Sequence, residues 1–229
     1  MNYSFTCQNI SYTYKQNYIL KNINFNFQPG QIVCLLGNNG SGKSTLLKVC
    51  AGVLNAQNGR VSINDNNILH LSEEERTQYI GWQPQNITRP FHLDLIDFIE
   101  ISNGIRPNRE NDLFEINSFL QKPISTLSGG EWKRGQLARL WQSNCKILLL
   151  DEPDSDLDLR HKKKLVHFCK KYAHENNAIL LIATHDILFA QEVANQICAI
   201  SEGYLVWNSS SEDFWRTKVI NKIFSTRVF

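Results

Sequence analysis

The chain has 229 residues, and its 24 lysines and arginines nearly balance its 22 aspartates and glutamates, which leaves a net charge of +2. A chain of this length can bury a substantial core and fits one domain, and the balanced charge gives no sign of a nucleic-acid partner. The longest apolar stretch covers only residues 178–183, whereas a membrane helix needs roughly 20, and Met1–Ser4 lacks the basic start of a secretion signal. We therefore expect that the chain does not cross a membrane itself.

The six cysteines form no C-x-x-C pair, and several of them lie within apolar runs. A thiol in such a run packs as a small hydrophobic group. We therefore predict free, buried thiols in a reducing cytosol.

The first third of the chain predicts strands, followed by a strand that runs into a helix. Residues 1–29 alternate apolar and polar side chains until Pro29-Gly30 interrupts the pattern. Further along we expect a buried strand over 31–36, a helix over 44–51, a short strand over 60–63 and a helix that begins with a capping box at Ser72.

Residues 86–126 differ from the rest because they show no strand-like alternation. Apolar residues at helical spacing form two groups, over 93–99 and 113–120, and the polar stretch 103–111 separates them. We interpret the segment as a helical insert of two helices joined by a turn.

Strands and helices alternate again after the insert. We expect a helix over 131–142, a strand over 146–150, a basic helix over 159–172, a strand over 178–183 and a helix over 187–194. Strands that alternate with helices indicate a parallel sheet with both faces covered. The sequence therefore predicts an α/β protein.

A P-loop lies between the predicted strand 31–36 and the helix that follows it. Its residues are Gly37, Asn38, Asn39, Gly40, Ser41, Gly42, Lys43, Ser44 and Thr45. The glycines let the backbone wrap a phosphate chain, so that N–H groups and a helix N-terminus face the anion. Lys43 is placed for the β- and γ-phosphates, and the Ser44 hydroxyl for Mg²⁺. A chance glycine-rich turn is the alternative, but strand, loop and helix all match the motif.

Asp151 and Glu152 follow the predicted strand 146–150, at the sheet edge where such folds bind ligands. Asp151 is suited to hold Mg²⁺ through water, and Glu152 to orient and polarise an attacking water. An ordinary acidic turn is the better interpretation of an isolated pair, but not of a pair that accompanies a P-loop.

A second candidate phosphate cradle, Ser128-Gly129-Gly130, precedes the helix that starts at Glu131. Exposed amides and the helix dipole would point at an anion there. The P-loop already surrounds the phosphates of its own chain from one side, so this cradle suits a γ-phosphate presented by another chain. The alternative is a simple helix cap.

These three motifs follow one another along the chain as the P-loop, the cradle at Ser128 and the pair Asp151-Glu152. In that order they resemble the nucleotide-binding subunit of an ABC transporter, and the resemblance covers nearly the whole chain. It implies an ATPase of the P-loop fold that uses ATP and Mg²⁺, with an N-terminal antiparallel β subdomain. It implies a head-to-tail dimer in which each signature loop, Ser128–Glu131, caps the nucleotide of the other subunit. It also implies a core of residues 1–85 and 127–205, a helical subdomain of 86–126 and a tail of 206–229.

The resemblance assigns an aromatic and a glutamine to the nucleotide. Tyr14 would stack on adenine, although Tyr12 is a close competitor. Gln85 would contact Mg²⁺ and sense the membrane partner. Gln83 lies nearby, but the position relative to Pro84 favours Gln85.

Two further residues take roles from the resemblance, and two depart from the family pattern. Asp158 matches the loop between the two sites, and His185 matches the switch histidine that contacts the γ-phosphate and helps catalysis. Glu131 stands where glutamine is usual, but Glu131-Trp132 is similar to vitamin B12 importer ATPases, so we expect activity. Asp156 stands where a small residue is usual and adds charge to the inter-subunit loop.

The resemblance implies separate integral-membrane permease subunits and a location at the cytoplasmic face of the inner membrane. Phe91–Ile99, Gly104–Pro107 and the tail Val219–Phe224 look like segments of the ATPases of iron-siderophore, haem and B12 importers. Ala138–Trp141 also appears in small haem-exporter ATPases. A soluble family member, such as an iron–sulfur assembly ATPase, is the other alternative, and the compact insert favours a transporter.

Overall fold

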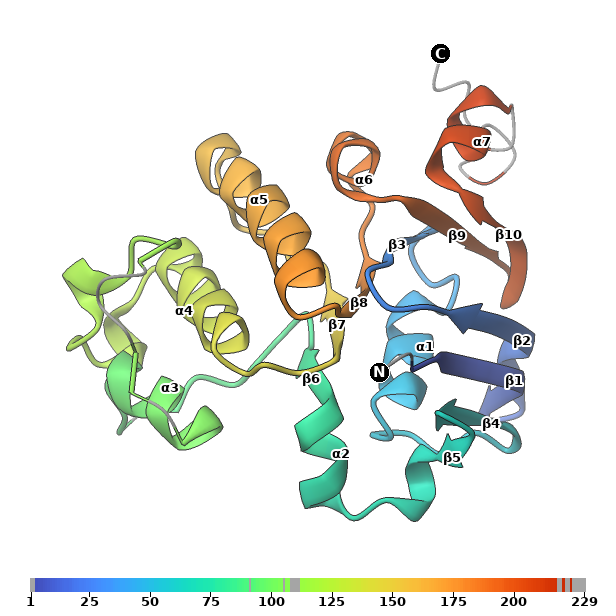
Figure 1. The fold of residues 1–229 in the computed structure, drawn as a ribbon, viewed down its shortest axis with the longest axis horizontal. Helices are drawn as coiled ribbons and strands as arrows, with labels where there is room; N and C mark the ends of the chain where they lie inside the picture. The colour runs from blue at the N-terminus through green and yellow to red at the C-terminus, as the bar shows by residue number, and fades with distance from the viewer. Residues whose placement is uncertain are drawn as a thin grey trace.

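The computed structural model describes residues 3–90, 92–104, 106–107, 112–217, 220 and 223. A six-stranded sheet in the order β10-β9-β3-β8-β7-β6 forms its centre (Figure 1). The strands are β3 (Ile32–Leu36), β6 (Ile80–Gln83), β7 (Ile147–Asp151), β8 (Ile179–Ala183), β9 (Gln196–Ser201) and β10 (Tyr204–Ser210). Neighbouring strands run parallel except β9 and β10, which confirms the predicted α/β fold with a mostly parallel core sheet.

A smaller, four-stranded antiparallel sheet lies beside the first and comes from the N-terminal part of the chain. Its strands are β1 (Phe5–Tyr14), β2 (Asn17–Phe27), β4 (Asn58–Ile63) and β5 (Asn66–Asn67). The second half of β2 alternates buried and exposed residues, as expected when one face packs on a core and the other meets solvent. The Lys21 N–H donates to the Gly203 carbonyl at 2.8 Å, which ties β2 to the turn between β9 and β10.

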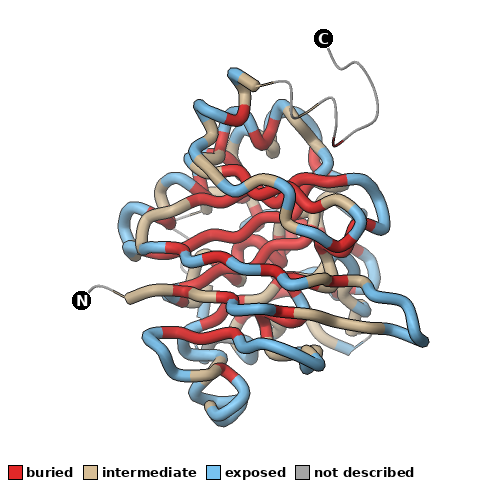
Figure 2. Tube along the Cα trace, turned by 90° about the vertical axis from the view of Figure 1, so that its right-hand side faces the viewer, coloured by how far each residue is buried: buried red, intermediate tan, exposed pale blue. Residues whose placement is uncertain are grey.

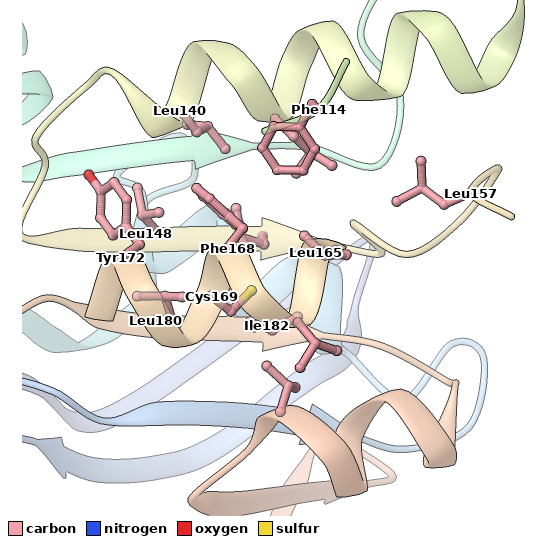
Figure 3. Close-up of a cluster of buried hydrophobic side chains, with 14 of the residues drawn as sticks. Phe114, Leu140, Leu148, Leu157, Leu165, Phe168, Cys169, Tyr172, Leu180 and Ile182 are labelled. Atoms are coloured by element: carbon pink, nitrogen blue, oxygen red, sulfur yellow. The ribbon is translucent and has the colours of Figure 1, made fainter. Parts of the chain in front are cut away.

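Both faces of the central sheet are covered, because successive side chains of each strand point to opposite sides. On β7, Leu149 joins the cluster that contains α1 (Lys43–Cys50) and the smaller sheet. Leu148 joins the cluster that contains α5 (Leu159–Glu175) and α6 (Ile187–Val193), and Figure 3 shows this second cluster. The tube view shows the buried segments running through the middle of the molecule (Figure 2).

In the helical insert, α3 (Leu95–Asn103) packs on α4 (Gly129–Trp141), away from the sheets (Figure 1). A Cβ at Gly135 would lie 2.5 Å from the Leu95 side chain, so glycine allows the two helices to approach this closely. The insert is therefore joined to the core through α4, the helix that begins at the signature loop.

The predicted second helix of the insert, over 113–120, is wrong. The structure has only a 3₁₀ turn there, Asn117–Phe119. The Asp112 carboxylate accepts hydrogen bonds from the N–H groups of Ile116 (2.6 Å) and Asn117 (3.1 Å), in place of helical carbonyls. Glu115 has φ of +54°, which no right-handed helix contains. Most of the apolar side chains of this segment are still buried in the core. Their spacing in the sequence resembles that of a helix, although the backbone is not helical.

Four strands and one α-helix of the described structure were not predicted from the sequence. Strand β5 has only two residues. Strand β6 is short, and Gly81 and Gln83 break its apolar pattern; a Cβ at Gly81 would lie 2.6 Å from the Leu148 side chain. The others are β9, β10 and α7 (Ser211–Arg216), which follow one another near the end of the chain. The helix expected at Ser72 is α2 (Glu73–Tyr79), and its capping box with Glu75 is confirmed.

Several expectations lie outside the described residues. They concern Phe91, Ile105, residues 108–111 and, in the tail 219–224, all residues except Ile220 and Ile223. All six cysteines are described, and each is free and buried, as predicted. Among the described residues, no helix combines the length and the apolar character that a membrane crossing requires.

Candidate active site

The P-loop follows a path that depends on two glycines. A Cβ at Gly37, directly after β3, would lie 2.3 Å from the Ile200 carbonyl oxygen. Gly42 precedes α1 with φ of +110°, and a Cβ there would lie 2.9 Å from the Ile19 carbonyl oxygen. The loop therefore passes directly against β9 and β2, and its amides gather at the N-terminus of α1.

Lys43, the first residue of α1, is buried and folds back over its own loop. Its ammonium donates to the carbonyls of Gly37 at 2.7 Å and Asn38 at 3.1 Å. Burial lowers the pKa of Lys43, and the negative charges of Glu152 and Asp151 oppose that shift. The loop thus holds a cation beside two carboxylates.

Two other P-loop residues face protein rather than open space. The Asn38 side chain donates to the Ile223 carbonyl at 3.0 Å. The Ser41 hydroxyl is buried and has no hydrogen-bond partner within the described structure. Their roles in nucleotide binding therefore stay predictions.

Asp151 ends β7 and is almost fully buried. Burial raises the pKa of Asp151, and the Ser44 hydroxyl, which donates to its Oδ1 at 3.1 Å, opposes that shift. The paired hydroxyl and carboxylate fit Mg²⁺ as P-loop enzymes hold it, because most of its remaining ligands there are waters and phosphate oxygens. No group of three or more histidines, cysteines, aspartates or glutamates forms a metal site within the described ranges.

Glu152 follows with φ of +47°, in the left-handed region, and its N–H donates to the Ala183 carbonyl at 2.8 Å. One carboxylate oxygen accepts from the Gln85 amide at 2.8 Å, and the other lies 3.2 Å from His185 Nδ1. The end of β7, the loop after β6 and the end of β8 therefore meet at one carboxylate.

A cavity of about 470 Å³ opens in front of these residues, a size suited to a small-molecule ligand. Its lining contains Ile19, Asn39, Gly40, Gly42, Lys43, Ser44, Thr45, Gln85, Glu152 and His185. Nine of these ten residues were predicted from the sequence, and the structure brings them together. Ile19, on β2, was missed because nothing in its strand pattern distinguishes it from a surface residue.

The two ambiguous sequence assignments now have distinct surroundings. Tyr14 is 57% exposed at the end of β1 and does not line the cavity, whereas Tyr12 packs against the core. Gln83 is fully buried and donates to Gln136 at 3.1 Å, whereas Gln85 lines the cavity. Tyr12 and Gln83 therefore have structural roles that explain them without a ligand.

The signature loop lies outside the 470 Å³ cavity of its own chain, since none of its four residues is in the lining. Ser128 is the N-cap of α4, and its hydroxyl accepts from the Glu131 N–H at 3.2 Å. Glu131 returns the contact, because its carboxylate accepts from the Ser128 N–H at 2.8 Å. The glutamate at the usual glutamine position is thus one half of a capping box.

Residues 151–158, which we call the acidic loop, join the cavity to the signature loop. Asp156 has φ of +60°, and its carbonyl oxygen would lie 3.2 Å from a Cβ at Gly130. Asp158 caps α5 and accepts from the His161 N–H at 2.8 Å, with its side chain exposed. Lys133 of α4 is buried and shares a second cavity of about 190 Å³ with Asp156 and Gln85.

A partly buried network beside His185 was not predicted from the sequence. It consists of Asp154, Thr184, Asp186 and Lys162. A threonine before the histidine and an aspartate inside the acidic loop were its only sequence signals.

Known proteins are similar to this chain in both sequence and fold. A family model described as ABC transporter matches residues 20–155, which is more than half of the chain. A relative from onion yellows phytoplasma (strain OY-M), named provisionally as an ABC transporter ATP-binding protein, is 33% identical over 89% of this chain, which spans only 37% of that protein.

The chain is also similar to a hemin import protein and to a solved ATP-binding cassette. The hemin import ATP-binding protein HmuV of Thermobifida fusca (strain YX) is 25% identical, over 96% of this chain and 82% of its own length. A dimeric structure of the ATP-binding cassette MJ0796, in a post-hydrolysis state with ADP and Pi, has a TM-score of 0.79 at 25% identity. That match covers 90% of this chain and 98% of the other.

Proposed function

Because the chain belongs to the ABC transporter family of ATP-binding cassettes, we propose that it binds and hydrolyses ATP as one half of a head-to-tail dimer. The observation that carries this proposal is the position of Glu152. Its two carboxylate oxygens contact Gln85 and His185, at 2.8 Å and 3.2 Å, at the edge of a cavity that also contains Lys43. The Glu152 carboxylate, the Lys43 side chain and the P-loop therefore line the same cavity.

Each residue would contribute by position and charge. Amides of the P-loop and the Lys43 ammonium would bind the β- and γ-phosphates, since the ammonium needs only to leave two backbone carbonyls of its own loop. Ser44 and Asp151 would hold Mg²⁺, which supplies positive charge that neutralises the phosphates. Glu152 would accept a proton of the attacking water and orient it, while Gln85 and His185 keep its carboxylate in place.

The position of the signature loop supports the proposed dimer. Its amides begin α4 but do not line the cavity of the same chain, so a second copy is needed to bring a signature loop to the γ-phosphate. The dimeric state of MJ0796 supports this arrangement.

We further propose that the dimer couples ATP hydrolysis to substrate movement through separate integral-membrane permease subunits. The chain would then lie at the cytoplasmic face of the inner membrane. Metal-chelate import, of siderophores, haem or cobalamin, is the substrate class we favour, because a hemin import protein is similar over 96% of the chain. Small haem-exporter ATPases and iron–sulfur assembly ATPases are the alternatives, and we expect no direct contact with nucleic acid.

The test is ATP hydrolysis by the purified chain with Mg²⁺ across a range of protein concentrations. Because two chains build each site, specific activity should rise with concentration until dimers saturate. Lys43→Ala is the matched control and should lose ATP affinity and activity together. Activity per chain that stays constant under dilution to monomers would contradict the composite site.

The transport assignment needs a separate experiment. We expect the chain, when purified from its native membranes, to bring down a multi-span permease. Recovery with sulfur-assembly scaffold proteins instead would favour the soluble alternative.

A further inference from the structure

His185 has an exposed ring but a tightly held backbone. Its side chain is 59% exposed, and within the described part of the chain its ring contacts the Glu152 carboxylate, at 3.2 Å. A ring with so few contacts keeps its orientation only if the backbone of the residues on either side of it is fixed. Those residues are Thr184 and Asp186.

Thr184 is fully buried and makes three polar contacts. Its N–H donates to the Leu35 carbonyl at 3.3 Å, which binds it to β3. Its hydroxyl donates to Asp154 Oδ1 at 3.0 Å and accepts from the Asp186 N–H at 3.0 Å. A single hydroxyl therefore connects the acidic loop to the peptide that follows His185.

Asp154 is a buried carboxylate with 3% exposure. Burial raises the pKa of Asp154, while the hydrogen bond from Thr184 is the main influence that favours its charged form. A buried carboxylate is costly unless its partners repay the lost hydration. The hydrogen bond from Thr184 therefore offsets part of the cost of burying the Asp154 carboxylate, and Asp154 in turn fixes the direction of the Thr184 hydroxyl.

We propose that Thr184 is a positioning residue for His185 and that Asp154 fixes the Thr184 hydroxyl in that role. The inference rests on the proposed ATP hydrolysis, because His185 matters only if Glu152 acts on a water. The hydroxyl sets the turn after β8 so that Nδ1 of His185 stays near the Glu152 carboxylate.

The network also reaches the inter-subunit side. Asp186 caps α6 through the Phe189 N–H, and its other oxygen lies 2.6 Å from Lys162 Nζ on α5. The Lys162 N–H in turn donates to the Asp158 carbonyl at 2.9 Å. The residue after His185 is therefore tied to the first turn of α5, next to the loop that would contact the partner subunit.

The experiment compares matched variants of the full chain. Thr184→Val removes the hydroxyl and keeps the shape, and Thr184→Ser keeps the hydroxyl. We expect Thr184→Val to lower kcat roughly tenfold or more, because small misplacements of catalytic groups have large effects. KM for ATP and the affinity for a fluorescent ATP analogue should change less than about twofold in Thr184→Val. Thr184→Ser should retain most of the wild-type kcat.

Asp154→Ala and Asp154→Asn form a second pair, which serves if Thr184→Val is too unstable to purify. The alanine removes the acceptor of the Thr184 hydroxyl, whereas asparagine keeps an oxygen there. We expect the alanine variant to lose kcat and the asparagine variant to retain most of it.

A double-mutant cycle separates positioning from general damage. In a His185→Ala chain, a further Thr184→Val or Asp154→Ala change should cause little additional loss, because both act through the missing ring. Full additivity, or wild-type kcat in both Thr184→Val and Asp154→Ala, would overturn the inference. A wild-type chain without ATPase activity would instead refute the proposed function itself.

Discussion

The nucleotide cavity and the signature loop are both predicted anion cradles at helix N-termini, but the fold builds them differently. The cavity draws its lining from β2, the P-loop, the loop after β6 and the ends of β7 and β8. The signature loop consists of four consecutive residues held by their own capping box. The first cradle therefore depends on long-range packing of buried strands, whereas the second is formed locally by consecutive residues.

The comparison implies that changes in the cavity should impair the nucleotide chemistry directly, whereas a change at Ser128 should impair hydrolysis only through the assembled pair. Glu152→Gln tests the first half and has the largest expected effect. The amide cannot accept a proton, so hydrolysis should fall by roughly 10² to 10⁴ while ATP still binds.

The trapped state gives a second readout. Size-exclusion chromatography with ATP should show a stable dimer of Glu152→Gln, because hydrolysis no longer releases it. Hydrolysis at the wild-type rate would contradict the proposed role of Glu152 and the expectation that changes in the cavity impair the chemistry.

Ser128→Arg tests the second half. We expect unchanged nucleotide binding by the monomer but no hydrolysis, since an arginine side chain fills the space where a γ-phosphate would approach bare backbone. A mixture with Lys43→Ala should recover part of the activity, because one composite site then contains an intact P-loop and an intact signature loop. Full activity of Ser128→Arg alone would contradict a cradle that acts on the other subunit.

A smaller effect is expected at the adenine end of the site. Tyr14→Ala should weaken ATP affinity by about 1 kcal/mol, the order of an aromatic contact, and change stability little because the ring is exposed. Tyr12→Ala is the matched control and should lower stability without a selective loss of affinity, since Tyr12 packs on the core. Titration with a fluorescent nucleotide and thermal unfolding would distinguish the two, and the reverse result would assign the adenine to Tyr12.

The smallest effect concerns the capping box. Glu131→Ala should lower stability by about 0.5 kcal/mol, and Glu131→Gln should lose less because an amide oxygen can still accept from Ser128. Hydrogen bonds from Ser128 hold the pKa of Glu131 below its usual value. The carboxylate's contribution is therefore complete above the unfolded pKa and disappears as pH falls through the lower folded value.

Thermal unfolding of the two variants against pH measures that contribution. The stability difference between wild type and Glu131→Gln should shrink in acid. A constant difference at all pH values would show that the charge of Glu131 does not matter to the cap.

The core and most of the cavity could be predicted because they depend on motifs with strict local requirements. Gly37, Gly42 and Lys43 follow from the P-loop pattern, and an apolar strand that ends in Asp151 predicts where the acids lie. The insert was harder, because apolar spacing over 113–120 indicates which residues are buried but not which hydrogen bonds their backbone makes. Asp112 and the positive φ of Glu115 determine those bonds.

The Thr184 network was unpredictable for a different reason. Asp154 and Thr184 are 30 residues apart, and their contact exists only because β7 and β8 are neighbours in the sheet. A single sequence gives no signal for such a pair.

The six buried cysteines have a practical consequence for measuring motion in this protein. Burial raises the pKa of thiols such as Cys34, Cys169 and Cys198, so the folded chain holds few reactive thiolates. A cysteine introduced at an exposed helix position such as Lys163 would therefore react with a maleimide dye long before any native thiol. Fluorescent reporters could then be placed on α5 without first removing the natural cysteines, and late labelling of the native six would report global unfolding.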